Sequence, residues 1–146
     1  MDNQLKLILY ILIIGFISGI HRTFVSNNNF NRLIVNYSLS KGKITQYFVP
    51  NLKGGISSRG ISSSTNYIKY IYTVNTKIIE NSYDFNSYID IPDIKPNLDI
   101  EYLVIFEKTN FKNSFILLNY PLSSDGDFDL YKKQFEIKIP KNVFKH

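Results

Sequence analysis

The sequence of 146 residues contains no cysteine and only two histidines, His21 and His146. The lack of cysteine excludes disulfides, thiolate metal sites and cysteine nucleophiles. A Ser-His-Asp triad would need either His21, which adjoins a hydrophobic segment, or His146, the last residue of the sequence. We therefore predict a protein that is not an enzyme and that has no catalytic residues, no metal site and no cofactor.

Arginine is also scarce, although the chain is basic. Seventeen Lys and Arg against twelve Asp and Glu give a formal net charge of +5, but only three of the seventeen are arginine. The lysines are scattered, and Lys132-Lys133 is their one adjacent pair. Nucleic-acid binding is typical of basic residues clustered on one surface, so we expect no nucleic-acid partner. Solvation, or attraction to anionic lipid head groups, explains a diffuse charge more simply.

The longest hydrophobic run covers residues 7–20, LILYILIIGFISGI, and contains no charge. These fourteen residues would span only about 21 Å as a helix, but residues 5–25 would span about 31 Å, the thickness of a hydrocarbon core. Lys6, His21 and Arg22 would then lie near the head groups. We predict a membrane anchor over residues 1–25, with membrane lipid as the partner of this helix, and we leave a protein partner open. The basic residues on its two sides are balanced, so its orientation is left open.

Two alternatives to the anchor remain. A basic residue followed by a short apolar run also fits a cleaved signal peptide, but Phe16 and Ile17 are too bulky for the small-x-small cleavage pattern around Ser18 and Gly19. A buried core helix is the other alternative. Gly15 and Gly19 form a G-x-x-x-G pair, which is more simply explained by the frequency of glycine in membrane segments.

The rest of the chain alternates apolar and polar residues at the period of strands. Residues 26–40 are rich in Asn and indicate a linker, residues 41–121 a β-domain, and residues 122–146 a C-terminal extension ending in an edge strand. Asn75-Thr76 suits a tight hairpin, because Asn tolerates positive φ. We expect strands at 43–49, 67–73, 77–83, 101–107, 114–119 and 135–139, a short extended piece at 88–91, and a Gly/Ser-rich loop at 51–66.

These patterns predict a mainly β protein: an N-terminal transmembrane helix followed by a small antiparallel sheet or barrel-like domain of about five to seven strands. The segment 101–107, EYLVIFE, is the most apolar of the expected strands and indicates a position inside the sheet.

Residues 41–121 also resemble a known group of sequences. The order GKITQYFVP, YIKYIYTVNTKIIENS and EYLVIFEKTNFKNSFILLNYPL is similar to small uncharacterised membrane-anchored proteins of Bacteroidetes, themselves reminiscent of DUF3592-type β-domains. Thr76 and Phe111 depart from the group, which usually has Gly and Pro there. The resemblance implies a β-domain and a membrane anchor, and no chemistry. The matching positions are Gly42, Lys43, Ile44, Tyr47, Tyr70, Tyr72, Val74, Asn75, Lys77, Glu80, Asn110, Asn113, Ser114, Ile116, Leu117 and Leu118.

The closest approach to a metal motif is DGDFD at 125–129. Asp125, Asp127, Asp129 and Glu136 match positions 1, 3, 5 and 12 of an EF-hand loop. The glycine required at position 6 is Leu130, however, and its absence removes the sharp bend of that loop. The sequence favours an ordinary acidic turn over a calcium site.

The remaining acidic and glycine-rich groups indicate loops. Asp84, Asp90, Asp93 and Asp99 lie among Pro and Asn residues, where solvent exposure argues against acid/base catalysis. The glycines at 54, 55 and 60 are not followed by Gly-Lys-Ser/Thr and are not a phosphate loop.

The function predicted from these features is a membrane-anchored, non-enzymatic β-domain with a binding or structural role. The alternative is a secreted or periplasmic binding module released by signal-peptide cleavage. A hydrolase is the third reading, for which no nucleophile and base can be named.

Overall fold

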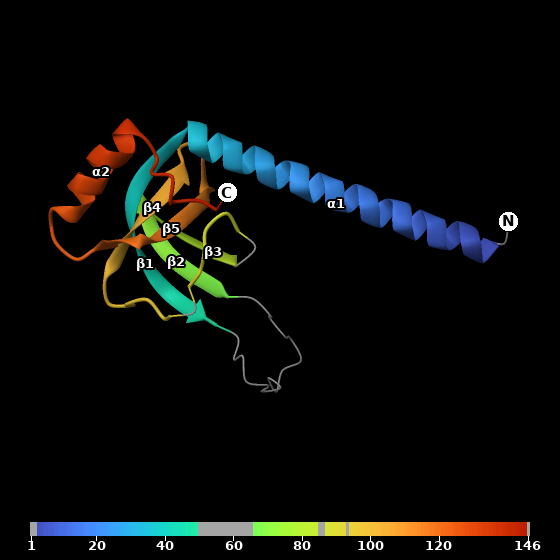
Figure 1. The fold of residues 1–146 in the computed structure, drawn as a ribbon, viewed down its shortest axis with the longest axis horizontal. Helices are drawn as coiled ribbons and strands as arrows, with labels where there is room; N and C mark the ends of the chain where they lie inside the picture. The colour runs from blue at the N-terminus through green and yellow to red at the C-terminus, as the bar shows by residue number, and fades with distance from the viewer. Residues whose placement is uncertain (1–2, 50–65, 85–86, 93, 146) are drawn as a thin grey trace.

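The computed structural model describes residues 3–49, 66–84, 87–92 and 94–145. It consists of one long N-terminal helix, α1 (Asn3–Val35), followed by a five-stranded antiparallel sheet and a short helix, α2 (Asp127–Ile137). Figure 1 shows α1 projecting away from a domain in which the curved sheet and α2 lie together. The predicted fold class is confirmed, and the sheet is open rather than closed into a barrel.

The five strands are β1 (Tyr37–Phe48), β2 (Tyr67–Val74), β3 (Lys77–Asp84), β4 (Glu101–Glu107) and β5 (Asn110–Leu122). Their order in the sheet is β3-β2-β1-β4-β5, and every neighbouring pair is antiparallel. The expected strands at 67–73, 77–83 and 101–107 are confirmed to within one residue, and β4 lies inside the sheet as predicted. β1 and β5 both begin earlier than expected, because their first residues pair with β4.

The β2–β3 hairpin has the two-residue turn that the sequence predicted. Asn75 has φ 48° and Thr76 has φ 69°, so both turn residues are in the left-handed region. This combination matches the right-handed twist of the flanking strands, and it places a β-branched residue where glycine is favoured. The pairing of Val74 with Lys77 and of Tyr67 with Asp84 continues the register along the whole hairpin.

Both faces of β4 are buried, since the sheet has a core on each side. On the inner, concave face Val104 and Phe106 lie with Ile116 and Ser114 of β5, which are their direct partners. On the outer face Leu103 and Ile105 are fully buried, and the base of α1 and the helix α2 lie on that side. This double burial explains the nearly continuous apolar sequence of β4.

Tyrosine rings fill the inner core. Tyr70 and Tyr72 of β2 are 0% and 2% exposed, and Tyr83 of β3 packs edge-to-face on Tyr70. Each hydroxyl has a partner: Tyr70 meets Ser114 Oγ at 2.9 Å, Tyr83 donates to the carbonyl of Ile116 at 2.6 Å, and Tyr72 donates to the carbonyl of Phe111. Burial raises the pKa of all three hydroxyls, which keeps them neutral.

The sheet curves until its two edge strands, β3 and β5, face each other without a backbone ladder. Side chains bridge them instead: Asn81 donates to the carbonyl of Lys112 at 2.7 Å and to Ser114 Oγ at 2.8 Å, and Lys112 reaches back to the carbonyl of Glu80. Polar side chains therefore cover strand edges that would otherwise be open to pairing with other chains.

Three sequence expectations are wrong. Residues 135–139 are not an edge strand, because residues up to 137 belong to α2. Residues 26–40 are not a linker: α1 continues to Val35 and β1 begins at Tyr37. Residues 88–91 form no strand. The expected loop at 51–66 falls, up to residue 65, outside the described residues.

Candidate functional site: the helix–sheet junction

Helix α1 has two parts with opposite surroundings, which we call the shaft (residues 6–25) and the base (residues 26–35). The helix is 33 residues long, or about 50 Å. Its apolar window is not buried anywhere against the domain, and side chains such as Leu12 and Phe16 are 63% and 73% exposed. The helix is long and apolar enough to cross a membrane, a property that signal sequences share. The shaft is thus a large apolar surface without a packing partner among the described residues.

The base, in contrast, is packed onto the domain. Leu33 is 0% exposed and belongs to the hydrophobic core. One turn earlier, the ring of Phe30 stacks on Tyr88 with a centroid distance of 3.9 Å and meets Phe144 edge-on at 4.9 Å. Phe115 of β5 contacts both Tyr88 and Phe144, which completes a cluster of four aromatic rings. The base therefore buries an apolar stripe, Phe30 and Leu33, within a stretch of sequence that is otherwise rich in Asn.

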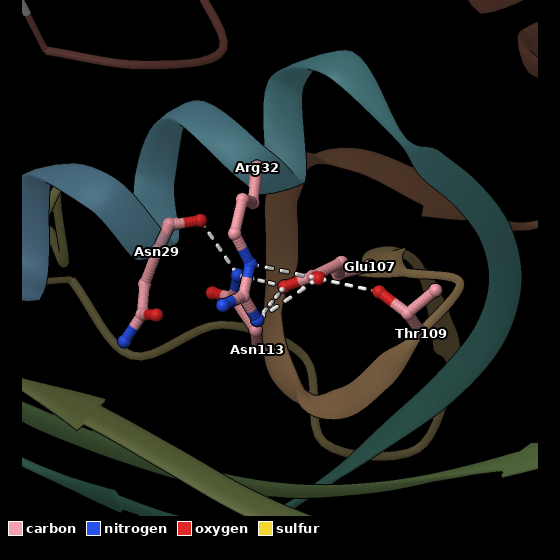
Figure 2. A network of polar contacts seen from close by, with 5 residues as sticks. All are labelled: Asn29, Arg32, Glu107, Thr109 and Asn113. Atoms are coloured by element: carbon pink, nitrogen blue, oxygen red, sulfur yellow. Dashed lines mark hydrogen bonds and ion pairs between the residues drawn. The ribbon is translucent and has the colours of Figure 1, made fainter.

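A polar network fixes the other side of the base. The guanidinium of Arg32 donates from Nε to Glu107 Oε1 at 3.1 Å and from Nη2 to Oε2 at 3.2 Å (Figure 2). The Glu107 side chain, at the end of β4, is only 2% exposed, whereas Arg32 is 48% exposed. A two-point contact of this kind sets the orientation of both groups as well as their separation.

Two side chains from the β4–β5 hairpin complete the network. Thr109 donates to Glu107 Oε1 at 2.6 Å, and Asn113 donates to Glu107 Oε2 and to the backbone carbonyl of Asn29 in α1, both at 2.7 Å. Burial alone would raise the pKa of Glu107, but the hydrogen bonds from Asn113, Thr109 and Arg32 outweigh it and hold this pKa below its usual range. The carboxylate is therefore charged at neutral pH and fully partnered.

This arrangement holds two elements of the fold together. Both oxygens of the Glu107 carboxylate accept hydrogen bonds, which come from Arg32, Thr109 and Asn113. Tyr88 adds a further tie, because its hydroxyl donates to Asn27 Oδ1 at 2.8 Å. The junction joins the helix to the sheet through an apolar cluster on one side and an ionic cluster on the other.

The acidic residues of the EF-hand-like motif start a helix instead of forming a loop. Asp127 and Asp129 lie in the first turn of α2, and Glu136 lies in its last turn. Asp127 accepts hydrogen bonds from the backbone N–H groups of Ser123 and Ser124, at 2.7 and 2.8 Å, and from the hydroxyl of Ser124. These bonds lower its pKa, and negative charge at a helix start is favourable. Across the described residues, no group of three or more His, Cys, Asp or Glu side chains could hold a metal ion.

The other residues singled out in the sequence are dispersed. Asp90 pairs with Lys145 at 2.8 Å, while Asp84 ends β3. His21 lies on the shaft, eleven residues before Arg32 in α1. Gly15 and Gly19 also lie on the shaft, with no atom of the domain near them. Asp93, His146 and the glycines at 54, 55 and 60 lie outside the described residues.

Sequence reasoning missed the junction. Arg32 and Glu107 are 75 residues apart in the sequence, and no local pattern relates them. The one available signal was apolar: Phe30 and Leu33 follow the shaft at helical spacing and continue it beyond the polar residues around them.

Comparison with known proteins adds no relative. No protein-family model matches the chain, and neither a curated protein nor a solved structure is significantly similar to it. The resemblance of residues 41–121 to membrane-anchored β-domain proteins therefore stays a prediction.

Proposed function

We propose that the protein is a membrane-anchored, non-enzymatic module whose β-domain is held at a fixed position above the bilayer by α1. The observation that carries this proposal is the continuity of one helix, which has an unpartnered apolar shaft and a base buried in the domain. A bilayer would cover the shaft, and the predicted resemblance implies the same combination of anchor and β-domain.

The length of the shaft suits this role. Residues 6–25 form twenty helical residues, or about 30 Å, the thickness of a hydrocarbon core. Arg22 follows the apolar run at head-group depth, where an arginine side chain is well tolerated. Diffuse positive charge on the domain would be attracted weakly to anionic head groups.

The junction converts the anchor into a rigid support. A flexible linker would let the domain tumble at the membrane surface, but here the helix enters the core without interruption. The aromatic cluster and the ionic network lie on different sides of the base, so together they oppose both bending and rotation of the helix.

A structural or surface-binding role is favoured over a buried ligand site, since tyrosine rings fill the inner face of the sheet. Tyr70 and Tyr72, whose direction decides between a packed core and an open groove, both point inward and are buried. Small-molecule sites are typically preformed hollows of about 300–1,000 Å³. Any binding by this domain is therefore expected on its outer surface or its strand edges.

The second candidate function is a secreted module released by cleavage of the N-terminal segment. Cleavage after residues 19–27 would cut α1 within four turns of Leu33, or inside the base itself, where Asn27 and Phe30 contact Tyr88. The buried base argues against cleavage at residues 26–27, and the bulky Phe16 and Ile17 argue against cleavage near Ser18 and Gly19.

Alkaline carbonate extraction of membranes from cells that make the tagged full chain tests the proposal. We expect the protein in the membrane pellet, with an intact mass that includes residues 1–25. Recovery of full-length protein in the supernatant would contradict the proposal. A mature protein that starts near residues 19–27 would favour the secreted module instead.

A further inference from the structure

One part of strand β1 has an open edge. β1 pairs with β4 continuously from Tyr37 to Lys43, but its pairing with β2 on the other side begins only at Gly42. β2 ends at Val74 and turns into the hairpin, and its last contact with β1 is the hydroxyl of Ser40, which donates to the carbonyl of Thr73 at 2.8 Å. The edge of residues 37–39 is therefore left without a strand partner among the described residues. An unpaired edge of this kind is a template for a further strand.

The register identifies the backbone groups that are exposed. The N–H of Lys108 donates to the carbonyl of Asn36 at 2.9 Å, which makes these two residues a hydrogen-bonded pair. Bonded and non-bonded pairs alternate along an antiparallel ladder, so Ser38 bonds to β4 while Tyr37 and Leu39 do not. The N–H and C=O groups of Tyr37 and Leu39 therefore point away from β4, toward the side on which β2 pairs with β1 only from Gly42 onward.

A groove lies beside this edge. It has a volume of about 440 Å³ between the start of β1 and one face of α2, the face that carries Phe128, Lys132 and Glu136. Tyr37, Leu39 and Lys108 also line it. Lys41 extends over the ring of Phe128 with its Nζ 5.4 Å from the ring centroid. The groove is thus partly apolar, with three lysines and one glutamate around it.

We propose that the open edge of β1 binds an extended, acidic peptide segment of a partner protein by strand addition. The backbone groups of Tyr37 and Leu39 supply hydrogen bonds to the added strand, and the excess of lysine favours acidic side chains on the side of α2. This inference rests on the proposed function only in that the module acts by binding. It does not need the anchor, so failure of the carbonate test would leave it intact.

The geometry predicts which peptide residues matter. Directly opposed residues in a sheet place their side chains on the same face, and Tyr37 and Leu39 face α2. The peptide residues that bond to them must therefore also point their side chains toward α2 and toward Lys132, Lys108 and Lys41 around the groove. In a peptide of alternating glutamate and valine, the glutamates would take these positions.

The test uses the full chain in detergent micelles and three fluorescein-labelled peptides of alternating glutamate and valine, read by fluorescence anisotropy. One peptide is unmodified, one is N-methylated on its glutamates and one on its valines. We expect the unmodified and valine-methylated peptides to bind. The glutamate-methylated peptide should lose at least about tenfold in affinity, because its methyl groups replace the bonding N–H groups. Equal binding of the two methylated peptides, or no binding of the unmodified peptide, would overturn the proposal.

A pair of charge variants of the protein tests the same site without any change to the peptide backbone. Lys132→Glu reverses a charge in the groove, whereas Lys133→Glu reverses the neighbouring charge, which does not line it. We expect the first variant to weaken peptide binding about 3- to 10-fold and the second to change it less than about twofold. Equal effects of both variants would contradict the proposed site. The oligomeric state of the full chain gives a further outcome. If the chain forms a dimer that Leu39→Pro dissociates, and no peptide binds, then a second copy of the chain occupies the edge. That result would also overturn the proposal.

Discussion

The shaft and the base of α1 belong to one helix, but they differ in what they contact. Gly15 and Gly19 of the shaft have no atom of the domain within 4 Å, whereas Leu33 of the base is fully buried. The base packs on the sheet, whereas the apolar window of the shaft is not buried against any described residue. One helix therefore combines a core element with a segment long and apolar enough to cross a membrane.

The largest expected effect is the difference in stability between matching Leu→Ala substitutions in the base and in the shaft. Leu33→Ala should destabilise the domain by about 2–5 kcal/mol, because it leaves a cavity in the core. Leu12→Ala, at a position 63% exposed on the shaft, should change the free energy of unfolding by less than about 0.5 kcal/mol. Urea unfolding in detergent, followed by the near-ultraviolet circular dichroism of the tyrosines, measures both. Similar values for the two variants would show that the base is not part of the core.

Glycine substitutions extend the comparison from the helix to the sheet. A Cβ at Gly42 of β1 would lie 2.4 Å from Val104 Cγ2 and 3.0 Å from the carbonyl oxygen of Ile71. Gly42→Ala should therefore cost about 1–3 kcal/mol through displacement of a fully buried neighbour. Gly15→Ala on the shaft meets no atom and should leave the unfolding midpoint of the domain unchanged. The same denaturation experiment checks this pair, and an unchanged midpoint for Gly42→Ala would refute the close packing of β1 on β4.

The ionic side of the junction should contribute a smaller amount. Glu107→Gln keeps the shape of the side chain but removes the charge that Arg32 contacts, and we expect a loss of about 1.5 kcal/mol. Glu101→Gln is the matched control, because Glu101 is exposed at the other end of the same strand. Thermal unfolding of the two variants at neutral pH compares them. An equal change in both would mean that the network does not hold the base.

The same carboxylate predicts a pH dependence. The pKa of Glu107 is lower in the folded state than its usual value, so its stabilisation is present above the unfolded pKa and is lost as the pH falls toward the folded pKa. Between about pH 5 and pH 3 the wild type should lose stability more steeply than Glu107→Gln. Unfolding midpoints across this range provide the measurement, and parallel curves would contradict the assignment.

The sequence predicts those elements that depend on interactions between residues close together along the chain. The hairpin of β2 and β3 and the strand β4 follow from alternation and from Asn75, which are local signals. The end of α2 has the pattern of a strand, because Phe135, Ile137 and Ile139 alternate with polar residues. Phe128, Tyr131 and Phe135 also share one face of a helix, and this is the pattern that the structure adopts. The packing of Phe135 on Tyr120 favours the helical period of 3.6 residues over the strand period of two. This tertiary contact cannot be read from the local sequence.

The junction lay beyond local reasoning for the same reason. The Asn-rich stretch before Leu33 has the composition of a linker, and only packing of Phe30 on Tyr88 and Phe144 keeps it helical. Glu107 and Arg32 are each ordinary charges until the fold brings them together. The helix of the shaft was predictable because residues 7–20 form an uninterrupted run without charge, with no competing pattern.

The central claim is that the shaft lies in a bilayer while the domain lies in water. The absence of native cysteine allows single-cysteine labelling with a charged maleimide on membranes opened by sonication, so that both faces are accessible. Ile14→Cys on the shaft and Ile78→Cys on the hairpin replace side chains of similar exposure in the chain, 67% and 73%. We predict that position 78 is labelled in membranes while position 14 is labelled only after detergent is added. Equal labelling of both positions in membranes would contradict the account.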